Sequence, residues 1–390
     1  MISVNDAIGR ILHTTKALES IEISISEALG YSLSEDISSP IDMPPFDNSA
    51  MDGYAIHEWD SNTYEVIDEI QAGADATQIV LQPGQAARIF TGAMVPESAT
   101  TVIKQEITER NGDSVSITED FKSGGNIRRK AEQIASGSVA LKKGTKLNAA
   151  AIGFLGMLGI DKVNVYRKPI IKILITGDEL VDAGNELKPG QIYESNAITL
   201  ISALKELGFD ATSVRVKDNY EDTFNLVKEL LQECDLLLTS GGISVGDYDF
   251  VGKAMIENGV HQEFYKIKQK PGKPLFYGFT ESCHVFALPG NPASALTCTY
   301  VYVYPALLRM IGSKDLTLPM MSFRVTNSYS KKLGFTHFLK GRIRNGNVES
   351  LEHQSSSMLD SFAQANCIIK LPQESAGFEP ETRVDVYLLP

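Results

Sequence analysis

The sequence predicts a multidomain α/β plus β protein, in which a central, doubly wound and mostly parallel α/β domain is accompanied by smaller β-rich domains. Strand and helix patterns alternate between residues 169 and 312, which implies right-handed crossovers and a mostly parallel sheet. On both sides of this region, short runs of β-type residues are separated by Gly, Pro and Asn, a pattern typical of β-rich domains. A chain of 390 residues is long enough for roughly two to four domains.

The N-terminal part of the chain is expected to hold two domains. Residues 1–45 and 140–168 are assigned to a linking domain, which begins with a helix and a short strand over residues 3–29. Residues 46–139 are assigned to a β-rich insertion domain. Its predicted strands lie at residues 64–70, 86–89, 101–105 and 114–117.

The Lys168-Pro169 dipeptide marks the start of the α/β domain, which is expected to span residues 169–312. Its predicted strands lie at residues 170–175, 211–216, 236–238, 263–267, 275–277 and 285–287. Its predicted helices lie at residues 197–207, 221–232, 250–257 and 292–310. Residues 313–390 return to short strand patterns and are expected to form a C-terminal β-barrel-like domain.

Composition narrows the classes of function. The formal net charge is −13 and no cluster of Lys or Arg rises above the background, which argues against a nucleic-acid partner. The N-terminus shows no signal peptide, and the most apolar stretches are too short or too interrupted to span a bilayer. The four cysteines are scattered without metal-ligand spacing. We therefore expect a soluble cytoplasmic protein with reduced thiols and no membrane partner.

A glycine-rich loop follows the predicted strand at residues 236–238 and is the strongest candidate for an anion site. Glycines allow backbone N–H groups to approach a phosphate, hydroxyl groups add donors, and the following helix presents its positive N-terminal end. The loop also carries Asp247 and Asp249, which would repel a bare phosphate. These acids suggest a divalent cation or a second, cationic ligand. The candidate phosphate-binding residues are Ser240, Gly241, Gly242 and Ser244.

Acidic residues follow several of the predicted parallel strands. The first strand ends in Thr176-Gly177-Asp178-Glu179, the second leads to Asp218, and the third to Asp249. Any one of these acids could simply cap a helix or occupy a solvated turn. Ligands of open α/β sheets bind beyond the carboxyl ends of the strands, so the acids are expected to converge on one crevice. Carboxylates without His or Cys favour Mg²⁺ over zinc.

Positive charge is concentrated in the segment 268–274, where two prolines and a glycine are expected to fix Lys270 and Lys273 in a loop. An ordinary surface turn is the alternative. Pro289 and Pro292 follow a later strand and are expected to shape its turn into a helix, with Pro292 at a first helical position.

Three polar loops of the β-rich insertion contain Asp52, Thr91 and Arg128. Taken by itself, each of these loops fits an ordinary turn better than a site. Arg128 could bind phosphate with two parallel hydrogen bonds, although the adjacent Arg129 commonly would point elsewhere.

Taken together, these motifs resemble the molybdopterin molybdenumtransferase family, which includes bacterial MoeA and the E domain of gephyrin. The resemblance covers essentially the whole chain. It rests on eight motifs in order, which are Asp52-Gly53-Tyr54-Ala55, Thr91-Gly92-Ala93, Asn126-Ile127-Arg128, Thr176-Gly177-Asp178-Glu179-Leu180, Gly190-Gln191-Ile192-Tyr193-Glu194-Ser195-Asn196, Ser240-Gly241-Gly242-Ile243-Ser244-Val245-Gly246, Lys270-Pro271-Gly272-Lys273-Pro274 and Leu288-Pro289-Gly290-Asn291-Pro292.

The resemblance implies an elongated homodimer of four-domain chains, which takes adenylated molybdopterin and molybdate and inserts molybdenum with Mg²⁺-dependent release of AMP. It also implies that the linking domain takes part in dimerisation and that the site lies between the α/β domain of one subunit and the β-rich insertion of the other. The implied catalytic residues are Asp52, Thr91, Glu179, Asp218 and Asp249, of which Asp52 and Thr91 come from the partner subunit. The implied metal ligands are Asp178, Glu179, Asp218 and Asp249. The implied substrate-binding residues are Thr176, Gly177, Ser240, Gly241, Gly242, Ser244, Lys270, Lys273, Pro289, Pro292 and Arg128.

Further partners implied by the resemblance are the molybdopterin adenylyltransferase and the maturation proteins of molybdoenzymes. The chain departs from the family where Ala131-Glu132-Gln133 replaces the usual Gly-Glu-Asp, which puts a role for Gln133 in doubt. Two alternatives stay open. The α/β domain alone resembles the adenylyltransferase, and the family also includes the gephyrin scaffold. The additional β-rich domains argue against the first alternative, and the intact acidic crevice argues against the second.

Overall fold

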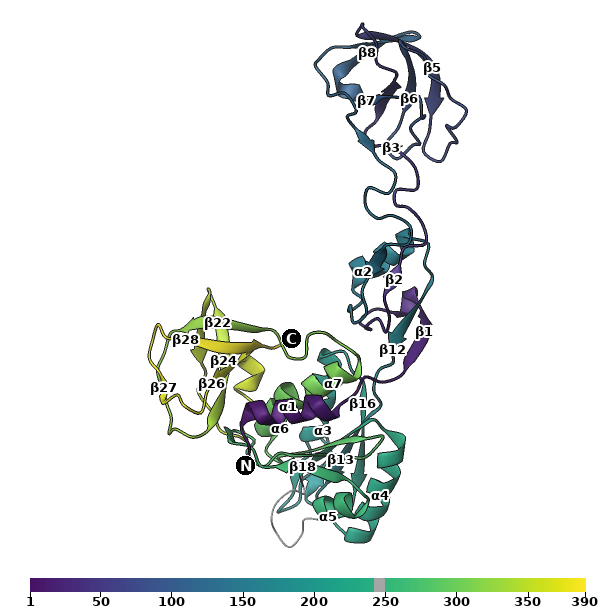
Figure 1. The fold of residues 1–390 in the computed structure, drawn as a ribbon. Helices are drawn as coiled ribbons and strands as arrows, with labels where there is room; N and C mark the ends of the chain where they lie inside the picture. Colours follow the sequence, from purple (N-terminus) through teal and green to yellow (C-terminus); the bar gives the residue numbers. More distant parts are fainter. Residues whose placement is uncertain (242–249) are drawn as a thin grey trace.

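A computed structural model of the full chain describes residues 1–241 and 250–390. The molecule is elongated (Figure 1). An α/β body and a β-barrel domain lie side by side at one end, and a long arm carries a separate β domain, here called the head, at the other end. The predicted fold class of multidomain α/β plus β is confirmed.

The body contains a six-stranded sheet in the order β16-β13-β17-β21-β20-β18. The first four strands in this order are parallel, and β20 and β18 are antiparallel to their neighbours. The strands are β13 (Ile171–Thr176), β16 (Ala211–Val216), β17 (Leu236–Ser240), β18 (His261–Tyr265), β20 (Phe276–Phe279) and β21 (His284–Leu288). Because β17 lies in the middle and is apolar on both faces, helices cover the sheet from both sides.

One face of this sheet packs against α3 (Asn196–Glu206) and the helical run made by α6 (Pro292–Cys298), a π-helical turn (Thr299–Val303) and α7 (Tyr304–Met310). The other face packs against α4 (Tyr220–Glu233) and α5 (Phe250–Glu257). Asn219 caps α4 through a hydrogen bond from the Asp222 N–H. Every helix in residues 1–241 and 250–390 is too short or too polar to span a lipid bilayer.

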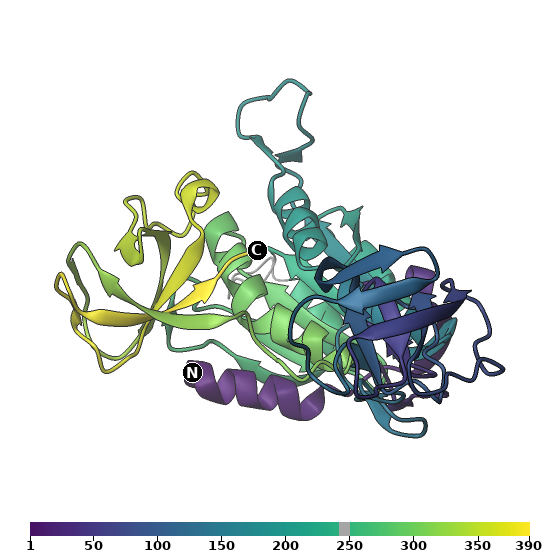
Figure 2. The ribbon, with the colours of Figure 1, turned by 90° about the horizontal axis from the view of Figure 1, so that it is seen from above.

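Helix α1 (Val4–Thr14) also packs against the body, although it precedes the arm in the sequence (Figure 2). Ser3 and Asp6 form a capping box at its start, and Val4, Ala7 and Ile11 bury one stripe of the helix in the core of the body. Figure 2 also shows the loop between β14 (Leu180–Val181) and β15 (Ile192–Tyr193) standing out from the body.

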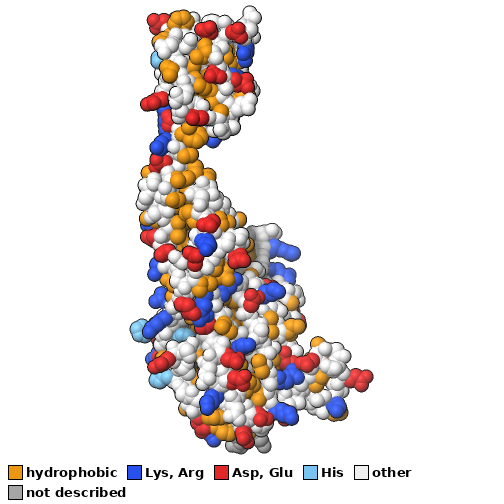
Figure 3. All heavy atoms as spheres, turned by 90° about the vertical axis from the view of Figure 1, so that its right-hand side faces the viewer, with side chains coloured by type: hydrophobic (Ala, Val, Ile, Leu, Met, Phe, Trp, Pro, Cys, Tyr) orange, Lys and Arg blue, Asp and Glu red, His pale blue; other side chains and the backbone are white. Residues whose placement is uncertain are grey.

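The part of the arm next to the body is built from two antiparallel strand pairs and a helix. Strand β1 (Ser20–Ser24) pairs with β12 (Lys162–Tyr166), and β2 (Ile37–Ser38) pairs with β11 (Val139–Leu141). Helix α2 (Ala149–Met157) is capped by Asn148 and is apolar on all sides. Only Ala151 and Leu155 of α2 are buried, so part of its apolar surface stays exposed. Figure 3 shows hydrophobic side chains at the surface along the arm.

The head contains a six-stranded sheet in the order β7-β4-β6-β5-β9-β8. Its strands are β4 (Gly53–Ile56), β5 (Thr63–Ile70), β6 (Gln85–Ile89), β7 (Thr101–Lys104), β8 (Thr108–Asn111) and β9 (Ser114–Ile117). Strand β3 (Asn48–Ser49) pairs with β10 (Ile127–Arg128) where the head joins the arm (Figure 1). Close to this junction, Ala131 adopts a φ of +62°. Glycine tolerates this left-handed conformation better than alanine does, which gives a physical reason for the glycine usual in the resembling family.

The C-terminal strands close into a barrel. They are β22 (Met320–Val325), β24 (Thr336–Arg344), β25 (Asn347–Ser350), β26 (Cys367–Leu371) and β28 (Arg383–Leu388). The ring closes because β24 pairs with both β25 and β26, while β22 pairs with both β25 and β28, and β28 pairs with β26. The short strand β19 (Gln269–Lys270) of the body adds to the edge of β24 and joins the two domains. A further short pair, β23 (Tyr329–Ser330) and β27 (Gly377–Phe378), lies outside the ring.

The arm is fastened to the body by Arg167, which lies where the chain returns from β12. Its guanidinium donates two hydrogen bonds to the Asp235 carboxylate, at 2.6 and 2.7 Å, and one to Glu19, at 2.5 Å. Glu19 lies where the chain leaves the body, and Asp235 lies at the start of β17. Burial tends to raise the pKa of Asp235, but hydrogen bonds from Arg167 and the Ile170 N–H outweigh it and lower this pKa. Arg167 therefore connects the segment that leaves the body, the segment that returns to it and the central strand β17.

Replacement of Arg167 by methionine is expected to lower the free energy of unfolding of the body by about 2–3 kcal/mol, because the partly buried Asp235 loses its charged partner. Chemical denaturation of the full chain measures this change. Arg215→Met is the matched control, since Arg215 forms an exposed ion pair with Asp182 and its loss should cost at most about 1 kcal/mol. Equal effects of the two substitutions would contradict a special role of Arg167.

Candidate active site

The structure brings two of the predicted acids together at the carboxyl edge of the body sheet. Asp178 follows β13 and Asp218 follows β16, and these strands are parallel neighbours. The Asp178 N–H donates to Asp218 Oδ2 at 3.3 Å, and the Asp218 N–H donates to Asp178 Oδ1 at 3.4 Å. Both residues are exposed. The two carboxylates are thus held next to each other and face solvent.

The other residues predicted at the end of β13 surround this pair. Glu179 is exposed, and its carboxylate lies against Gly177, where an added Cβ would be 2.9 Å from Glu179 Oε2. Gly177 has a φ of +135°, so a side chain there would be strained as well as crowded. Thr176 lies beside Gly241, since its Oγ1 is 4.0 Å from the position of a Cβ on that glycine.

Asn196, at the start of α3, connects two loops at the middle of the carboxyl edge of the body sheet. Its Nδ2 donates to Ser240 Oγ at 2.7 Å and to the Gly290 carbonyl at 2.8 Å. It therefore connects the end of β17 to the loop that follows β21. Sequence reasoning did not assign Asn196 to the site, because an asparagine at a helix start fits a simple cap equally well.

Three predicted site residues, Gly242, Ser244 and Asp249, lie outside the described residues. Within residues 1–241 and 250–390, no group of three or more His, Cys, Asp or Glu side chains could hold a metal ion. The described part of the predicted metal site is therefore the Asp178–Asp218 pair together with the nearby Glu179.

The predicted lysines lie at the same edge of the sheet, beyond β21. The loop that carries them connects β18 to β20 and lines a cavity of about 540 Å³. Pro289 also lines this cavity, whereas Pro292 starts α6 at a first helical position. Residues of the barrel also line the cavity. The residues lining the cavity that sequence reasoning missed include Asn291, Ser294, Tyr329, His337, Ser355 and Ser356.

Polar contacts fix the barrel side of this cavity. The Asn291 Nδ2 donates to Ser356 Oγ at 2.9 Å, which joins the loop after β21 to the barrel. His337 is nearly buried and shares a hydrogen bond of 3.0 Å with the Tyr329 hydroxyl. Burial and the nearby charges of Lys331 and Lys270 lower the pKa of His337 to about 4, so its ring is neutral at pH 7. The permanent positive charges of the cavity are therefore those of the lysines.

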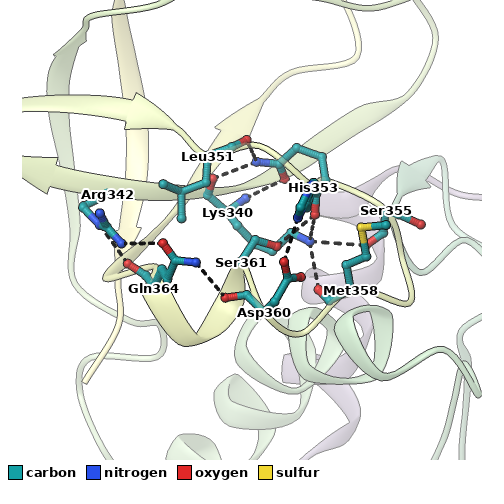
Figure 4. A network of polar contacts seen from close by, with 10 residues as sticks. Lys340, Arg342, Leu351, His353, Ser355, Met358, Asp360, Ser361 and Gln364 are labelled. Atoms are coloured by element: carbon teal, nitrogen blue, oxygen red, sulfur yellow. Dashed lines mark hydrogen bonds and ion pairs between the residues drawn. The ribbon is translucent and has the colours of Figure 1, made fainter.

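A buried lysine of the barrel holds the loop that carries Ser355 and Ser356 (Figure 4). Lys340 is 3% exposed, and its ammonium donates to the carbonyls of His353 (2.7 Å), Ser355 (3.2 Å) and Met358 (3.1 Å). All three donors of the ammonium are thus used. Burial lowers the pKa of Lys340. Its signal in the sequence was weak, because a lysine in a strand usually points to solvent.

The head positions the remaining predicted residues. The Thr91 N–H and hydroxyl both donate to Asp52 Oδ1, at 2.8 and 2.7 Å, and these hydrogen bonds, with a smaller contribution from Arg88, lower the pKa of Asp52. Asp52 is therefore ionised at neutral pH. Gly53 must lack a side chain, because a Cβ would lie 1.8 Å from the Ile103 carbonyl oxygen on β7.

Arg88 reinforces this corner of the head. Its guanidinium stacks on the rings of Tyr54 and Phe90, at 5.1 and 5.0 Å, and donates to the Gly53 carbonyl at 3.1 Å. The predicted Arg128 is exposed on β10, while Arg129 binds Asp47 at 2.6 Å. The head lies far along the arm from the body edge (Figure 1). Among the described residues, a single chain therefore places the acids and lysines in one group and Asp52, Thr91 and Arg128 in another.

Comparisons with known proteins agree on one family. Family models match residues 2–159 (MoeA N-terminal region, domain I and II), 172–309 (probable molybdopterin binding domain) and 322–389 (MoeA C-terminal region, domain IV). The molybdopterin molybdenumtransferase of Staphylococcus epidermidis is 33% identical, over 99% of this chain and 95% of the relative. That of Staphylococcus aureus is 30% identical over the same shares. The molybdopterin biosynthesis moeA protein from Pyrococcus horikoshii OT3 has a TM-score of 0.87 and 28% identity, with 100% of both chains covered.

Lys340→Met is expected to lower the free energy of unfolding by about 2–3 kcal/mol, because three carbonyl groups lose their buried donor. Chemical denaturation measures the change. Lys332→Met, at an exposed position of the same domain, is the control and should stay within about 0.5 kcal/mol of the parent. If Lys340→Met is as stable as this control, the ammonium does not hold the loop of Ser355 and Ser356.

Proposed function

Since the chain belongs to the molybdopterin molybdenumtransferase family, we propose that it transfers molybdenum from molybdate to adenylated molybdopterin, with Mg²⁺-dependent release of AMP. The observation that carries this proposal is that negative side chains lie at one end of the carboxyl edge of the body sheet and positive side chains at the other. Two paired carboxylates lie beyond β13 and β16, and two lysines line a cavity beyond β21. The substrate is expected to lie across this edge.

The acid side suits a hard cation. Mg²⁺ is usually held by one or two carboxylates together with substrate phosphates, and the exposed Asp178–Asp218 pair offers this donor set. Bound there, Mg²⁺ would neutralise charge on the phosphates of the adenylate, which is the main requirement for cleaving a phosphoanhydride. Glu179 lies next to the pair, and Asp249 is proposed to join it.

The lysine side suits an oxyanion. Lys270 and Lys273 supply positive charge, and Ser355, Ser356 and Asn291 supply hydroxyl and amide groups around the same cavity. We assign molybdate, the metal substrate, to this cavity. Thr176, Gly177, Ser240 and Gly241 lie between the two ends of the edge and are proposed to contact the pterin phosphate.

The head is proposed to complete the site of a second chain in a homodimer. Asp52 is ionised and Thr91 orients it, yet both lie far from the edge of their own body. The exposed apolar side chains of the arm, including Leu29, Val139 and Met157, offer a surface for a second copy. Arg128, which is exposed on the same head, would then meet the adenylated substrate.

The substrate must come from an adenylyltransferase, and the product must pass to maturation proteins of molybdoenzymes. Both are proposed partners of this chain, and the cytoplasm is the proposed location of the reaction.

The direct test is to incubate the purified protein with adenylated molybdopterin, molybdate and Mg²⁺. We expect AMP release together with formation of molybdenum cofactor. Exhaustive chelation of divalent cations should abolish both, and added Mg²⁺ should restore them. AMP release that persists unchanged after chelation would contradict the metal requirement, and no AMP release under any condition would refute the proposed activity.

The shared site is tested by mixing variants. Asp52→Ala and Asp218→Ala are each expected to be inactive as homodimers. Coexpressed in equal amounts, they should recover about a quarter of the parent activity, because half of the dimers are mixed and each mixed dimer has one intact site.

Asp178→Ala mixed with Asp218→Ala is the matched control and should recover nothing, since both substitutions affect the same half of the site. Absence of recovery in the Asp52–Asp218 mixture would mean that each chain builds its own site.

A further inference from the structure

The lysine loop is pressed onto the helical run that covers the sheet. Gly272, between the two lysines, has a φ of +84°, and a Cβ there would lie 2.6 Å from Cys298 Sγ and 2.8 Å from Gln269 Nε2. Cys298 is completely buried at the end of α6. The backbone of the loop therefore packs directly on a buried layer. The contacts in that layer determine the position of the backbone from which the two lysine side chains extend.

Gln269 is the polar centre of this layer. The residue is 1% exposed, although it directly precedes Lys270. Its Nε2 donates to the Gly272 carbonyl at 3.0 Å and contacts Cys298 Sγ at 3.5 Å. Its Oε1 accepts a hydrogen bond from the Tyr302 hydroxyl. The amide nitrogen of Gln269 thus binds the loop, and the amide oxygen binds Tyr302.

Tyr302 defines the orientation of that amide. Its side chain is completely buried, and burial raises the pKa of its hydroxyl well above the usual value, so the hydroxyl remains a donor. A donor at this position requires the amide oxygen to face Tyr302, which leaves the amide nitrogen for Gly272.

A helical irregularity places Tyr302 under the loop. Tyr302 lies in the π-helical turn Thr299–Val303, in which the Tyr304 N–H bonds to the Thr299 carbonyl. Pro305 follows directly and has no N–H to offer to Val301, so a regular α-helix would lose a hydrogen bond here. The π turn accommodates this loss and changes the direction of the side chains within it.

We propose that Gln269 and Tyr302 are positioning residues for the molybdate subsite, because the chain from the Tyr302 hydroxyl through the Gln269 amide to the Gly272 carbonyl sets the loop that presents Lys270 and Lys273. The inference rests on the proposed function, since it assumes that these lysines bind the oxyanion. Tyr302 does not line the cavity, and Gln269, at its edge, is 1% exposed and has its amide engaged by Gly272 and Tyr302. Their loss therefore weakens the binding of molybdate and leaves the acid side of the site intact.

The test compares Tyr302→Phe with the parent in the AMP-release assay, with molybdate varied at saturating adenylated molybdopterin and Mg²⁺. We expect KM for molybdate to rise about fivefold or more, the effect of losing one buried hydrogen bond, with kcat nearly unchanged. Gln269→Met should act in the same direction, because methionine has no N–H to donate to the Gly272 carbonyl. It also decides the question if Tyr302→Phe does not fold.

Tyr300→Phe is the matched control. Tyr300 is a buried tyrosine of the same π turn, but it packs against Phe362 and lines a groove beside α3. Its KM for molybdate should equal that of the parent. If the parent and Tyr300→Phe release AMP, and KM in folded Tyr302→Phe and Gln269→Met is unchanged, the positioning role is overturned. If the parent itself releases no AMP, the proposed function fails instead, and calorimetric titration of the parent and both variants with molybdate then decides the positioning role by Kd.

Discussion

The bidentate pair of Arg167 and Asp235 is the interaction on which the arrangement of the domains depends. The chain crosses between body and arm twice, and Arg167 binds Glu19 on one crossing while it holds Asp235 at the start of β17. The opposite end of β17 carries Ser240 and the glycine loop. The arm is therefore fastened at the beginning of this central strand, and the site lies at its end. One strand thus relates the position of the arm to that of the site.

The predicted site residues fall into two groups, one on the body and one on the head. The body gathers acids, glycines and lysines along one edge, since parallel strands deliver their carboxyl ends to the same place. The head offers Asp52, an ionised carboxylate that accepts two hydrogen bonds from Thr91. The arm keeps the two groups of one chain apart (Figure 1). For the two groups to act together, a second chain must supply one of them, which is why dimerisation and catalysis are expected to be inseparable in this protein.

The sequence was sufficient for the parts of the site that depend on local patterns. The strand ends that are followed by Asp178 and Asp218, and the lysine loop with its two prolines and a glycine, are visible because each strand or loop is encoded by a short segment. The barrel side was missed for a physical reason. Lys340 and Ser355 meet across a loop, and Gln269 and Tyr302 are 33 residues apart, so only the packing of separate elements brings them together. A buried lysine or glutamine has no pattern of its own in the sequence.

The buried polar groups under the lysine loop bear on how an acidic protein could hold an oxyanion at the proposed site. With a net charge of −13, the chain as a whole repels anions, and two mobile surface lysines would be offset by solvent and by nearby acids. Lys270 and Lys273 are exposed, but the backbone of their loop is fixed by Gln269, and residues of the barrel line the same cavity. The neutral state of His337 adds no competing proton equilibrium near pH 7. At the proposed site, selectivity for an oxyanion would then depend on the fixed position of the loop rather than on the amount of positive charge.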